Sequence, residues 1–221
     1  MRIVIFGTSG MVGQGALREA VLDERVSDIL SVVRSPSGQS HPKLSEIVLL
    51  DLTRIAEVAD RLAGFDACLF CLGVSSLGMS EAAYTSVTHD LTLTIADVLA
   101  PRNRAMTFIY VSGTGTSRDS RQMWARVKAR TEDALAAMPF KAAYGFRPGF
   151  IQPLHGVKSK TGWYAALYAL TRPLAPLLTR RLPAIATTTE RLGRAMIAVA
   201  ANGYPAATLE NTAINAAGAL A

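Results

Sequence analysis

RIVIFGTSGMVG, at residues 2–13, is the stretch that decides the fold of this chain. Residues 3–6 are an apolar run of the kind expected for a strand buried on both faces. Gly7, Gly10 and Gly13 follow, and residues 15–22 then have the composition and spacing of a helix. A strand, a glycine turn and a helix in this order predict a phosphate site, because the free N–H groups and the positive end of the helix dipole face the turn.

The glycines follow the spacing G-x-x-G-x-x-G, whereas the usual dinucleotide fingerprint is G-x-G-x-x-G. We expect the whole turn to hold the pyrophosphate of a dinucleotide. Besides the three glycines, the expected cofactor-binding residues there are Thr8, Ser9, Met11 and Val12. The alternative is a strand-to-helix turn that binds nothing.

Length and composition predict a single domain over residues 1–221, since 221 residues that are 50% hydrophobic can bury one sizeable core. Residues 151–221 are expected to complete the fold and to form the substrate side. The first strand begins directly after Arg2, so no signal peptide is expected and the predicted location is cytoplasmic.

Cys68 and Cys71 are the only cysteines, and they form a C-x-x-C pair inside an apolar run. Redox and zinc chemistry both use such pairs, but the sequence has no second ligand pair, and a strand points residues three apart to opposite faces. We predict two buried free thiols in a reducing compartment and no metal site.

The net charge of +6 is confined to the C-terminal part of the chain. Residues 134–221 hold nine Lys and Arg but only two Asp and Glu. This excess suits an anionic substrate, a cofactor phosphate or an acidic surface, and the alternative is a solvated basic face. The sequence has no nucleic-acid-binding motif, so we expect no nucleic-acid partner.

Apolar runs and helical periodicity alternate along the first 147 residues. The expected strands are 3–6, 28–33, 46–50, 66–72, 106–111 and 142–146, and the expected helices are 15–22, 54–63, 80–99, 120–138 and 190–201. The expected helix caps are Thr53, Ser80 and Thr189, and 208–214 is expected to be a last strand. Such alternation predicts a parallel, doubly wound α/β sheet that binds ligands at the carboxyl ends of its strands.

Arg34 and Ser35 end the second strand, where a dinucleotide fold places the adenosine ribose. An acidic residue there favours NAD, whereas a guanidinium and a hydroxyl both donate hydrogen bonds to a 2′-phosphate. We therefore predict NADP(H) as the preferred cofactor, with NAD(H) as the alternative, unless Arg34 is only an exposed loop residue. Other cofactor-binding residues expected at these strand ends are Asp51, Leu52, Leu72, Gly73 and Val74.

Residues 163–178 are apolar and aromatic, with basic residues on both sides. The stretch is too short and too charged to span a bilayer, and Pro173 and Pro176 would kink or end a helix. We expect a substrate lid or a helix that lies on a membrane or partner surface through residues 163–181, or else a helix packed on the domain.

Several short motifs together resemble the atypical short-chain dehydrogenase/reductase superfamily. They are the glycine turn, CLG at 71–73, VSG at 111–113, WARVK at 124–128 and FRPG at 146–149. Within that superfamily the chain is similar to the small proteins that resemble the Tat-interacting oxidoreductase and to bacterial epimerase/dehydratase-like proteins. The resemblance covers residues 1–150 best, and it implies a Rossmann fold with bound NAD(P)(H).

In that superfamily a Ser after the fifth strand and a Tyr-x-x-x-Lys on the next helix act together. The resemblance gives Ser112 the role of holding the substrate oxygen and Lys128 that of binding the nicotinamide ribose. The position of the proton-transferring tyrosine is occupied by Trp124. An indole N–H only donates and cannot exchange a proton near neutral pH. The resemblance also places the turn of Arg147, Pro148, Gly149 and Phe150 beside the nicotinamide.

Two functions fit this sequence. The first is an NADP(H)-dependent oxidoreductase or epimerase-like enzyme that acts on an unknown small, anionic substrate without the usual tyrosine. The second is a non-catalytic NADP(H)-sensing module that presents its surface to a protein partner. The substrate, the direction of the reaction and the oligomeric state do not follow from the sequence.

Overall fold

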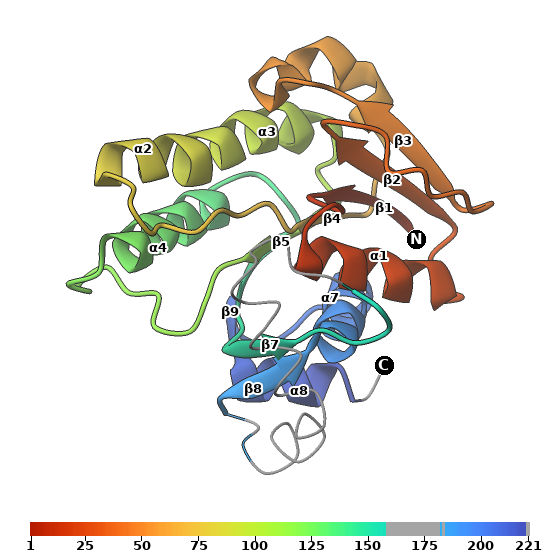
Figure 1. The fold of residues 1–221 in the computed structure, drawn as a ribbon. Coiled ribbons are helices and arrows are strands. Elements are labelled where there is room, and N and C mark those ends of the chain that lie inside the picture. Colours follow the sequence, from red (N-terminus) through yellow and green to blue (C-terminus); the bar gives the residue numbers. More distant parts are fainter. Residues whose placement is uncertain (158–181, 183, 220–221) are drawn as a thin grey trace.

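The computed structural model describes residues 1–157, 182 and 184–219. In this part the chain forms a seven-stranded sheet with helices on both faces (Figure 1). The strands are β1 (Arg2–Phe6), β2 (Asp28–Val33), β3 (Leu44–Val48), β4 (Ala67–Phe70), β5 (Thr107–Val111), β6 (Ala142–Arg147) and β9 (Thr208–Glu210). Their order is β3-β2-β1-β4-β5-β6-β9, and every neighbouring pair is parallel. This is the predicted Rossmann-type doubly wound sheet.

β1 lies in the middle of the sheet and is covered on both faces, as its unbroken apolar run predicts. Ile3, Val4, Ile5 and Phe6 are all 0% exposed. Ile3 and Ile5 belong to one hydrophobic core, while Val4 and Phe6 belong to the other. Successive side chains of a strand point to opposite faces, so this one segment contributes to both layers of the domain.

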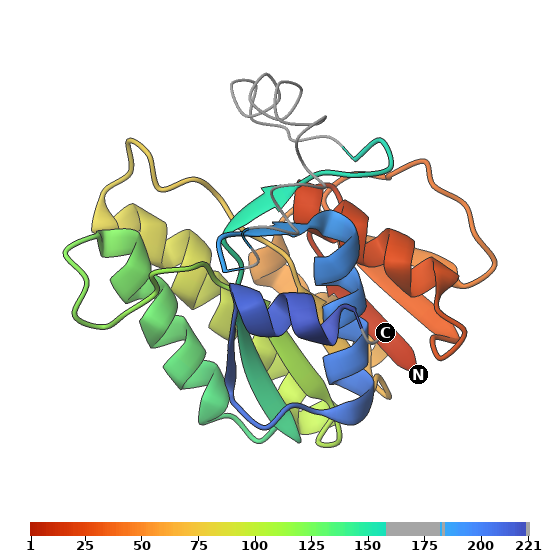
Figure 2. The ribbon, with the colours of Figure 1, turned by 90° about the horizontal axis from the view of Figure 1, so that it is seen from below.

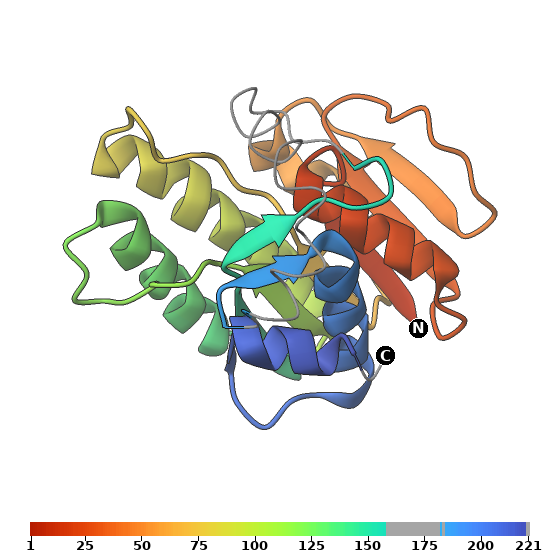
Figure 3. The ribbon, with the colours of Figure 1, turned by 60° about the horizontal axis from the view of Figure 1, so that its bottom comes forward.

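The helices divide between the two faces of the sheet (Figures 2 and 3). One core contains side chains of α1 (Met11–Leu22), α7 (Thr189–Asn202) and α8 (Asn211–Ala217). The opposite face carries η1 (Leu52–Leu62), α2 (Glu81–Thr85), η2 (Ser86–Asp90), α3 (Leu91–Leu99), η3 (Ala100–Arg102) and α4 (Met123–Ala136). No helix in the described ranges is long and apolar enough to cross a membrane.

A second, two-stranded sheet lies beside the carboxyl ends of the main strands (Figure 3). It pairs β7 (Phe150–Gln152) in parallel with β8 (Ala186–Thr188). Asn211 of α8 accepts a hydrogen bond from the Gly149 amide at 2.9 Å, and Asn215 donates to the Ala186 carbonyl at 2.9 Å. Helix α8 therefore fixes the small sheet. The predicted lid or surface segment 163–181 falls outside the described residues.

The structure corrects two predicted helix caps. η1 is a 3₁₀ helix that begins after Asp51, whose carboxylate accepts a hydrogen bond from the Thr53 amide at 2.9 Å. Thr53 is therefore the donor at this cap. Helix α7 is capped by Thr188 and not by Thr189, since the Thr188 hydroxyl accepts from the Arg191 amide at 3.0 Å. The observed caps lie two residues and one residue before the predicted ones.

Two further elements differ from the predictions. The helix expected over 80–99 contains a π-helical turn, η2, although it begins as predicted with a Ser80 cap. The last strand stops at Glu210 and not at Ile214, because β6, its only neighbour among the described strands, ends at Arg147, which pairs with Glu210. Beyond that point the chain turns into α8, and Ile214 is fully buried in the core of α1 and α7.

Candidate functional site

The glycine turn after β1 lies directly against the loop that follows β4. Gly7 has a φ of +89°, and a Cβ on it would lie 2.8 Å from the backbone carbonyl of Cys71 and 2.9 Å from the Leu72 nitrogen. Only glycine accepts both the positive φ and this contact. The turn is also tied to β2, because the Thr8 hydroxyl bonds to Ser31 at 2.7 Å inside the core.

The other two glycines of the turn differ in how closely the chain surrounds them. A Cβ on Gly13 would lie 2.1 Å from the Gly7 oxygen, so the first turn of α1 touches the end of β1. A Cβ on Gly10 would meet only the Gly7 oxygen, at 3.4 Å. Contacts inside the protein therefore explain Gly7 and Gly13, whereas the small size of Gly10 leaves open space at the start of the helix.

No side chain in the described part of the molecule caps the N-terminus of α1. Its cap residue, Gly10, has no side chain to cap it, and the first turn contains no acidic residue. The first amides of the helix have no intrahelical acceptor, and they lie at the positive end of the helix dipole. The arrangement suits an anionic group such as a pyrophosphate.

A cavity of about 300 Å³ lies at the carboxyl ends of β2, β3 and β4. It brings together six of the predicted cofactor-binding residues: Arg34, Asp51, Leu52, Leu72, Gly73 and Val74. Leu50, Thr53, Val87 and Leu91 also line it, and the sequence analysis missed these four. Leu50, Val74 and Val87 are large apolar residues with 82%, 51% and 41% exposure. An apolar wall that is open to solvent suits a flat, ring-shaped ligand group.

The polar groups of this cavity differ in what they already bind. Arg34 is exposed and forms no hydrogen bond or ion pair within the described part of the chain, while Ser35 next to it is also exposed. The Asp51 carboxylate accepts from both the amide and the hydroxyl of Thr53, which lower the pKa of that carboxyl. Arg34 is therefore the free cation at this rim of the cavity.

Ser112 lies at the end of β5 and is nearly buried. Its hydroxyl bonds to the Thr116 hydroxyl at 2.8 Å, and Thr116 also donates to the Gly113 carbonyl at 2.8 Å. A hydroxyl has one hydrogen, so Ser112 is the donor of the bond to Thr116. Thr116 was missed in the sequence analysis, although it follows Ser112 by four residues in the same polar loop.

Lys128 of α4 is half-buried beside the same loop. Its ammonium group donates to the carbonyl oxygens of Val111 at 3.1 Å and of Ser112 at 2.8 Å, and it lies 5.7 Å from the centre of the Tyr110 ring. Burial lowers the pKa of Lys128 to about 8, against the opposing influence of the Glu132 carboxylate. The structure thus brings the predicted Ser112 and Lys128 together.

Trp124 lies where the resemblance places the tyrosine, one helical turn before Lys128. Its indole lies against the loop after Ser112, because a Cβ on Gly113 or Gly115 would be 3.7 or 3.8 Å from the ring. The indole N–H donates to the side-chain oxygen of Gln122. The ring therefore covers the loop after β5 and offers no acidic or basic group.

No described tyrosine hydroxyl takes over this position. Tyr110 and Tyr84 are both 2% exposed, and burial raises the pKa of each. Tyr144 donates to the carbonyl of Tyr204 at 3.3 Å and accepts from its amide at 3.0 Å. Tyr110 is a core residue.

The turn after β6 bonds to the loop after β5 and to the residue before β8. Thr114 bonds through its amide to the Pro148 carbonyl and through its hydroxyl to the Arg147 carbonyl, both at 3.0 Å. A Cβ on Gly149 would lie 2.2 Å from the Ile185 oxygen, and the Phe150 amide donates to the same oxygen at 2.8 Å. The turn therefore connects the loop after β5 with the small sheet.

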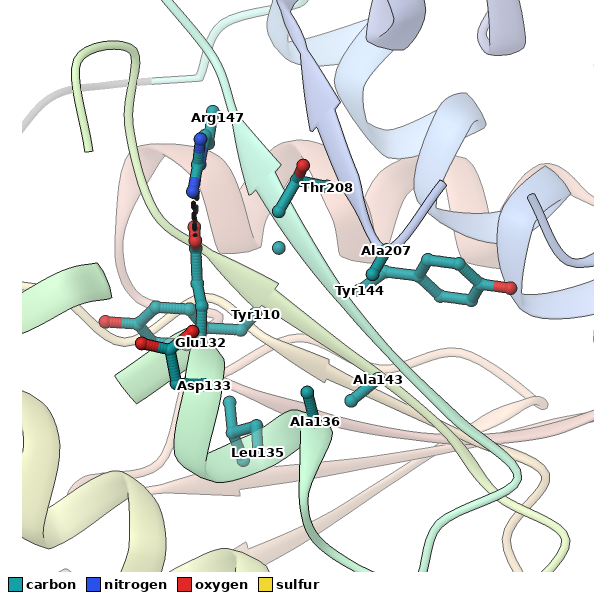
Figure 4. Close-up of a pocket in the computed structure, with 11 residues that line it drawn as sticks. Tyr110, Glu132, Asp133, Leu135, Ala136, Ala143, Tyr144, Arg147, Ala207 and Thr208 are labelled. Atoms are coloured by element: carbon teal, nitrogen blue, oxygen red, sulfur yellow. Dashed lines mark hydrogen bonds and ion pairs between the residues drawn. The ribbon is translucent and has the colours of Figure 1, made fainter. Parts of the chain in front are cut away.

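The side chain of Arg147 is engaged inside the protein. It binds Glu132 through two hydrogen bonds of 3.1 and 2.5 Å (Figure 4). It also binds Glu210 at 3.1 Å. Arg147 is thus unlike Arg34, whose guanidinium has no partner among the described residues. Glu132 is 7% exposed and was missed in the sequence analysis, although it follows Lys128 by one helical turn.

Neither cysteine contributes a reactive group. Both are free thiols, as predicted, and burial raises the pKa of Cys71 to about 12. Cys68 is fully buried, and Cys71 is partly exposed beside the glycine turn. Among the described residues, no group of three or more His, Cys, Asp or Glu gathers in a way that could hold a metal ion.

Comparison with curated proteins gives distant relatives. The chain is 25% identical over 159 residues to protein fmp52, mitochondrial, of Emericella nidulans, a match that covers 67% of this chain and 66% of that protein. It is 26% identical over 171 residues to fmp52-2, mitochondrial, of Aspergillus terreus, with 74% and 72% covered. The chain thus spans about two thirds of the length of these relatives. No protein-family model matches it.

Comparison with solved structures is more extensive. The enzyme WbmF of Bordetella bronchiseptica, in complex with NAD⁺, superposes with a TM-score of 0.68 at 14% identity, covering 97% of this chain and 76% of WbmF. A short chain dehydrogenase family protein of Francisella tularensis gives 0.65 at 13% identity, covering 91% of both chains. The chain has the same fold as these two proteins. The Rossmann fold that the motif resemblance implies is therefore confirmed.

The comparisons also correct one prediction. The sequence analysis expects a cytoplasmic location, whereas the four curated relatives are all named mitochondrial proteins, at 25 or 26% identity. The prediction was wrong because it rested on the position of the first strand. That position describes the folded domain and carries no information about the compartment.

Proposed function

We propose that this chain is an NADP(H)-dependent oxidoreductase or epimerase-like enzyme that acts on a small substrate. The observation that carries the proposal is the uncapped start of α1 at Gly10, together with the nearby cavity that contains the free guanidinium of Arg34. A dinucleotide has a pyrophosphate, an adenine and, in NADP(H), a 2′-phosphate. The uncapped helix, the apolar wall and the unpaired cation match these three groups in turn.

Each part of the cofactor has candidate partners in this chain. The amides at the start of α1 would bind the pyrophosphate, and the apolar wall around Leu52 and Val74 would contact the adenine. Arg34 and Ser35 would bind the 2′-phosphate. Lys128, which is held at the end of β5, would bind the nicotinamide ribose. The bound cofactor would supply the hydride chemistry.

The residues around Ser112 define what the protein itself contributes to catalysis. Ser112 can donate a hydrogen bond to a substrate oxygen once its hydroxyl turns away from Thr116. Lys128 places a positive charge beside that position. Trp124 supplies neither an acid nor a base, so the proton must come from water, from Ser112 or from the substrate. A slow reaction, or a substrate that brings its own proton donor, is the expected consequence.

The same substitution favours one second candidate function, a non-catalytic module that senses NADP(H). The indole of Trp124 packs against the loop after β5 and leaves no described proton-transfer group at the tyrosine position. Such a module would bind the cofactor with the same residues but would not turn it over. Measurement of cofactor binding and of activity in the same preparation separates the two functions.

Replacement of Arg34 with alanine is expected to weaken NADPH binding roughly 10- to 100-fold, because a charge-assisted hydrogen bond contributes about 1.5–3 kcal/mol. NADH lacks the 2′-phosphate, so its affinity should change less than about threefold. Titration of the purified protein with each nucleotide, followed by tryptophan fluorescence, measures both constants. A Trp163→Phe background assigns the signal to Trp124, the other tryptophan of the chain.

The matched control for this experiment is Arg61→Ala. Arg61 is an exposed arginine of η1 that does not line the cavity, so neither affinity should change. Equal losses of NADPH and NADH affinity in Arg34→Ala would contradict the assignment of Arg34 to the 2′-phosphate. Failure of the unmodified protein to bind either nucleotide would contradict the proposed function itself.

The affinity for NADPH is also expected to fall as the pH rises above about 8. Burial lowers the pKa of Lys128 from its usual 10.5 to about 8, so the side chain loses its charge in a range where an ordinary lysine keeps it. Titrations between pH 6.5 and 9.5 measure this dependence. Lys128→Gln should bind more weakly at neutral pH and show no such fall, and an unchanged pH profile in that variant would rule out Lys128 as its origin.

A further inference from the structure

A partly buried ion pair lies one helical turn along α4 from Lys128. Glu132 is 7% exposed, and Arg147 of β6 holds its carboxylate with two hydrogen bonds. Figure 4 shows the carboxylate meeting the guanidinium, with the Tyr110 ring beside Glu132. Among the described residues, the side chains of this pair form hydrogen bonds only with each other and, for Arg147, with Glu210, so their position needs an explanation beyond direct cofactor contact.

Gly145 of β6 leaves room for the Glu132 carboxylate. A Cβ on Gly145 would lie 2.7 Å from Glu132 Oε1 and 2.8 Å from its carboxyl carbon. The sheet therefore leaves out one side chain at the place where the Glu132 carboxylate rests. Beside it is a cavity of about 120 Å³, lined by Tyr110, Tyr144 and Thr208 among others. Burial of a charged group is costly unless it is paired, and here the fold accommodates both charges.

Tyr110 connects the ion pair with the active-site lysine. Its ring lies 5.7 Å from the Lys128 nitrogen on one side and lines the cavity beside Glu132 on the other. Lys128 and Glu132 are four residues apart on α4 and so share one face of the helix. The charged and titratable groups around Lys128 are thus Tyr110 of β5, Glu132 of α4 and, behind them, Tyr84 of α2, Arg147 of β6 and Glu210 of β9.

We propose that Glu132, held by Arg147 in the space beside Gly145, is a positioning residue for Lys128. Its negative charge stabilises the ammonium group that donates to the carbonyl oxygens of Val111 and Ser112. Arg147 prevents the carboxylate from swinging to Lys128 and neutralising it in a direct ion pair. Lys128 consequently stays charged and keeps hydrogens directed at the end of β5. That this serves a cofactor ribose rests on the proposed function.

The decisive variant is Glu132→Gln, which keeps the shape of the side chain and removes its charge. In the cofactor-free protein, Lys128 should titrate about one pKa unit lower than in the unmodified protein, because an opposite charge nearby favours the ammonium form. Lysine labelled with ¹³C at Cε gives the titration by NMR. The chain has only five lysines, and the loss of one signal in Lys128→Met assigns the resonance.

Two further variants make the result specific. Glu210→Gln removes the other, more exposed carboxylate from Arg147 and should leave the titration of Lys128 unchanged. Gly145→Ala keeps every charge but pushes the carboxylate away from β6. It should raise the pKa of Lys128, in contrast to Glu132→Gln, because a carboxylate pushed away from β6 and Arg147 can approach the ammonium group. The contact is with the flexible end of a side chain, so the fold should survive. This variant tests the proposal even if Glu132→Gln does not fold.

The outcomes separate this inference from the proposed function. An unchanged titration of Lys128 in both Glu132→Gln and Gly145→Ala would overturn the positioning role, whether or not the protein binds NADPH. A lowered titration in Glu132→Gln, in a protein that binds no dinucleotide, would support the positioning role and refute the cofactor. If NADPH binds, its affinity in Glu132→Gln should begin to fall about one pH unit earlier than in the unmodified protein.

Discussion

Replacement of Trp124 with tyrosine is expected to raise the turnover of NADPH with carbonyl substrates about 10²- to 10⁴-fold, the usual contribution of a positioned general acid. The variant places a phenol one helical turn before Lys128, whose positive charge lowers the pKa of a neighbouring hydroxyl. Ser112 already lies at the end of β5, where the proposed function has it hold the substrate oxygen. A panel of ketones, aldehydes, quinones and nucleotide sugars, assayed at saturating NADPH, measures kcat/KM.

The matched control is Trp124→Phe, which opens the same space but carries no hydroxyl. It should show the low activity of the unmodified protein, so a gain in both variants would mean that the indole only blocks the site. Tyrosine without any gain, in a protein that still binds NADPH, would support the sensing module. A high activity in the unmodified protein, lost in Trp124→Tyr, would mean that the indole itself takes part in substrate binding.

Replacement of Gly13 with alanine is expected to destabilise the fold by about 3 kcal/mol, at the upper end of overpacking costs. The new methyl group would lie 2.1 Å from the Gly7 oxygen and 2.8 Å from the Thr8 Cα, and both are backbone atoms that cannot turn aside. The start of α1 would have to move away from β1. For a chain of this length the unfolding temperature should fall by roughly 6–12 °C, which thermal unfolding followed by circular dichroism measures.

Gly10→Ala is the control that separates stability from binding. Gly10 has a φ of −88°, which alanine accepts, and its Cβ would have one ordinary neighbour at 3.4 Å. Its unfolding temperature should therefore stay within about 2 °C of the unmodified protein, while NADPH binding weakens because the methyl group stands before the helix amides. Equal stability losses in both variants would show that Gly10 is a structural glycine and would remove the argument for a phosphate site.

The sheet could be predicted from the sequence because its signals are local. The apolar run at residues 3–6 and the glycines after it specify a buried strand and a close helix without reference to distant residues. The last strand could not be placed in this way. Residues 211–214 have a strand-like composition, but their structure depends on where β6 ends and on the core position that Ile214 fills. Tertiary contacts overrode local preference there.

The candidate site was likewise predictable only where local sequence signals exist. Strand ends could be found in the sequence, and the structure brings six predicted residues, among them Arg34 and Gly73, into one cavity. The partners of those residues could not be found. Arg34 and Arg147 are both arginines at a strand end, yet one is free and the other is bound by Glu132 and Glu210, which lie on two other elements. Pairing of this kind depends on the folded arrangement and leaves no pattern along the chain.

The small sheet of β7 and β8 has an evolutionary consequence. Its parallel register pairs Phe150 with Ala186 and Gln152 with Thr188, so the two ends of the connection between these strands are fixed side by side. Lengthening a connection between fixed ends costs only about 0.6 kcal/mol for each doubling. Insertions and deletions between these two strands should therefore have little effect on the stability of the seven-stranded domain. Related chains can therefore differ in length at this connection without a change in the seven-stranded sheet.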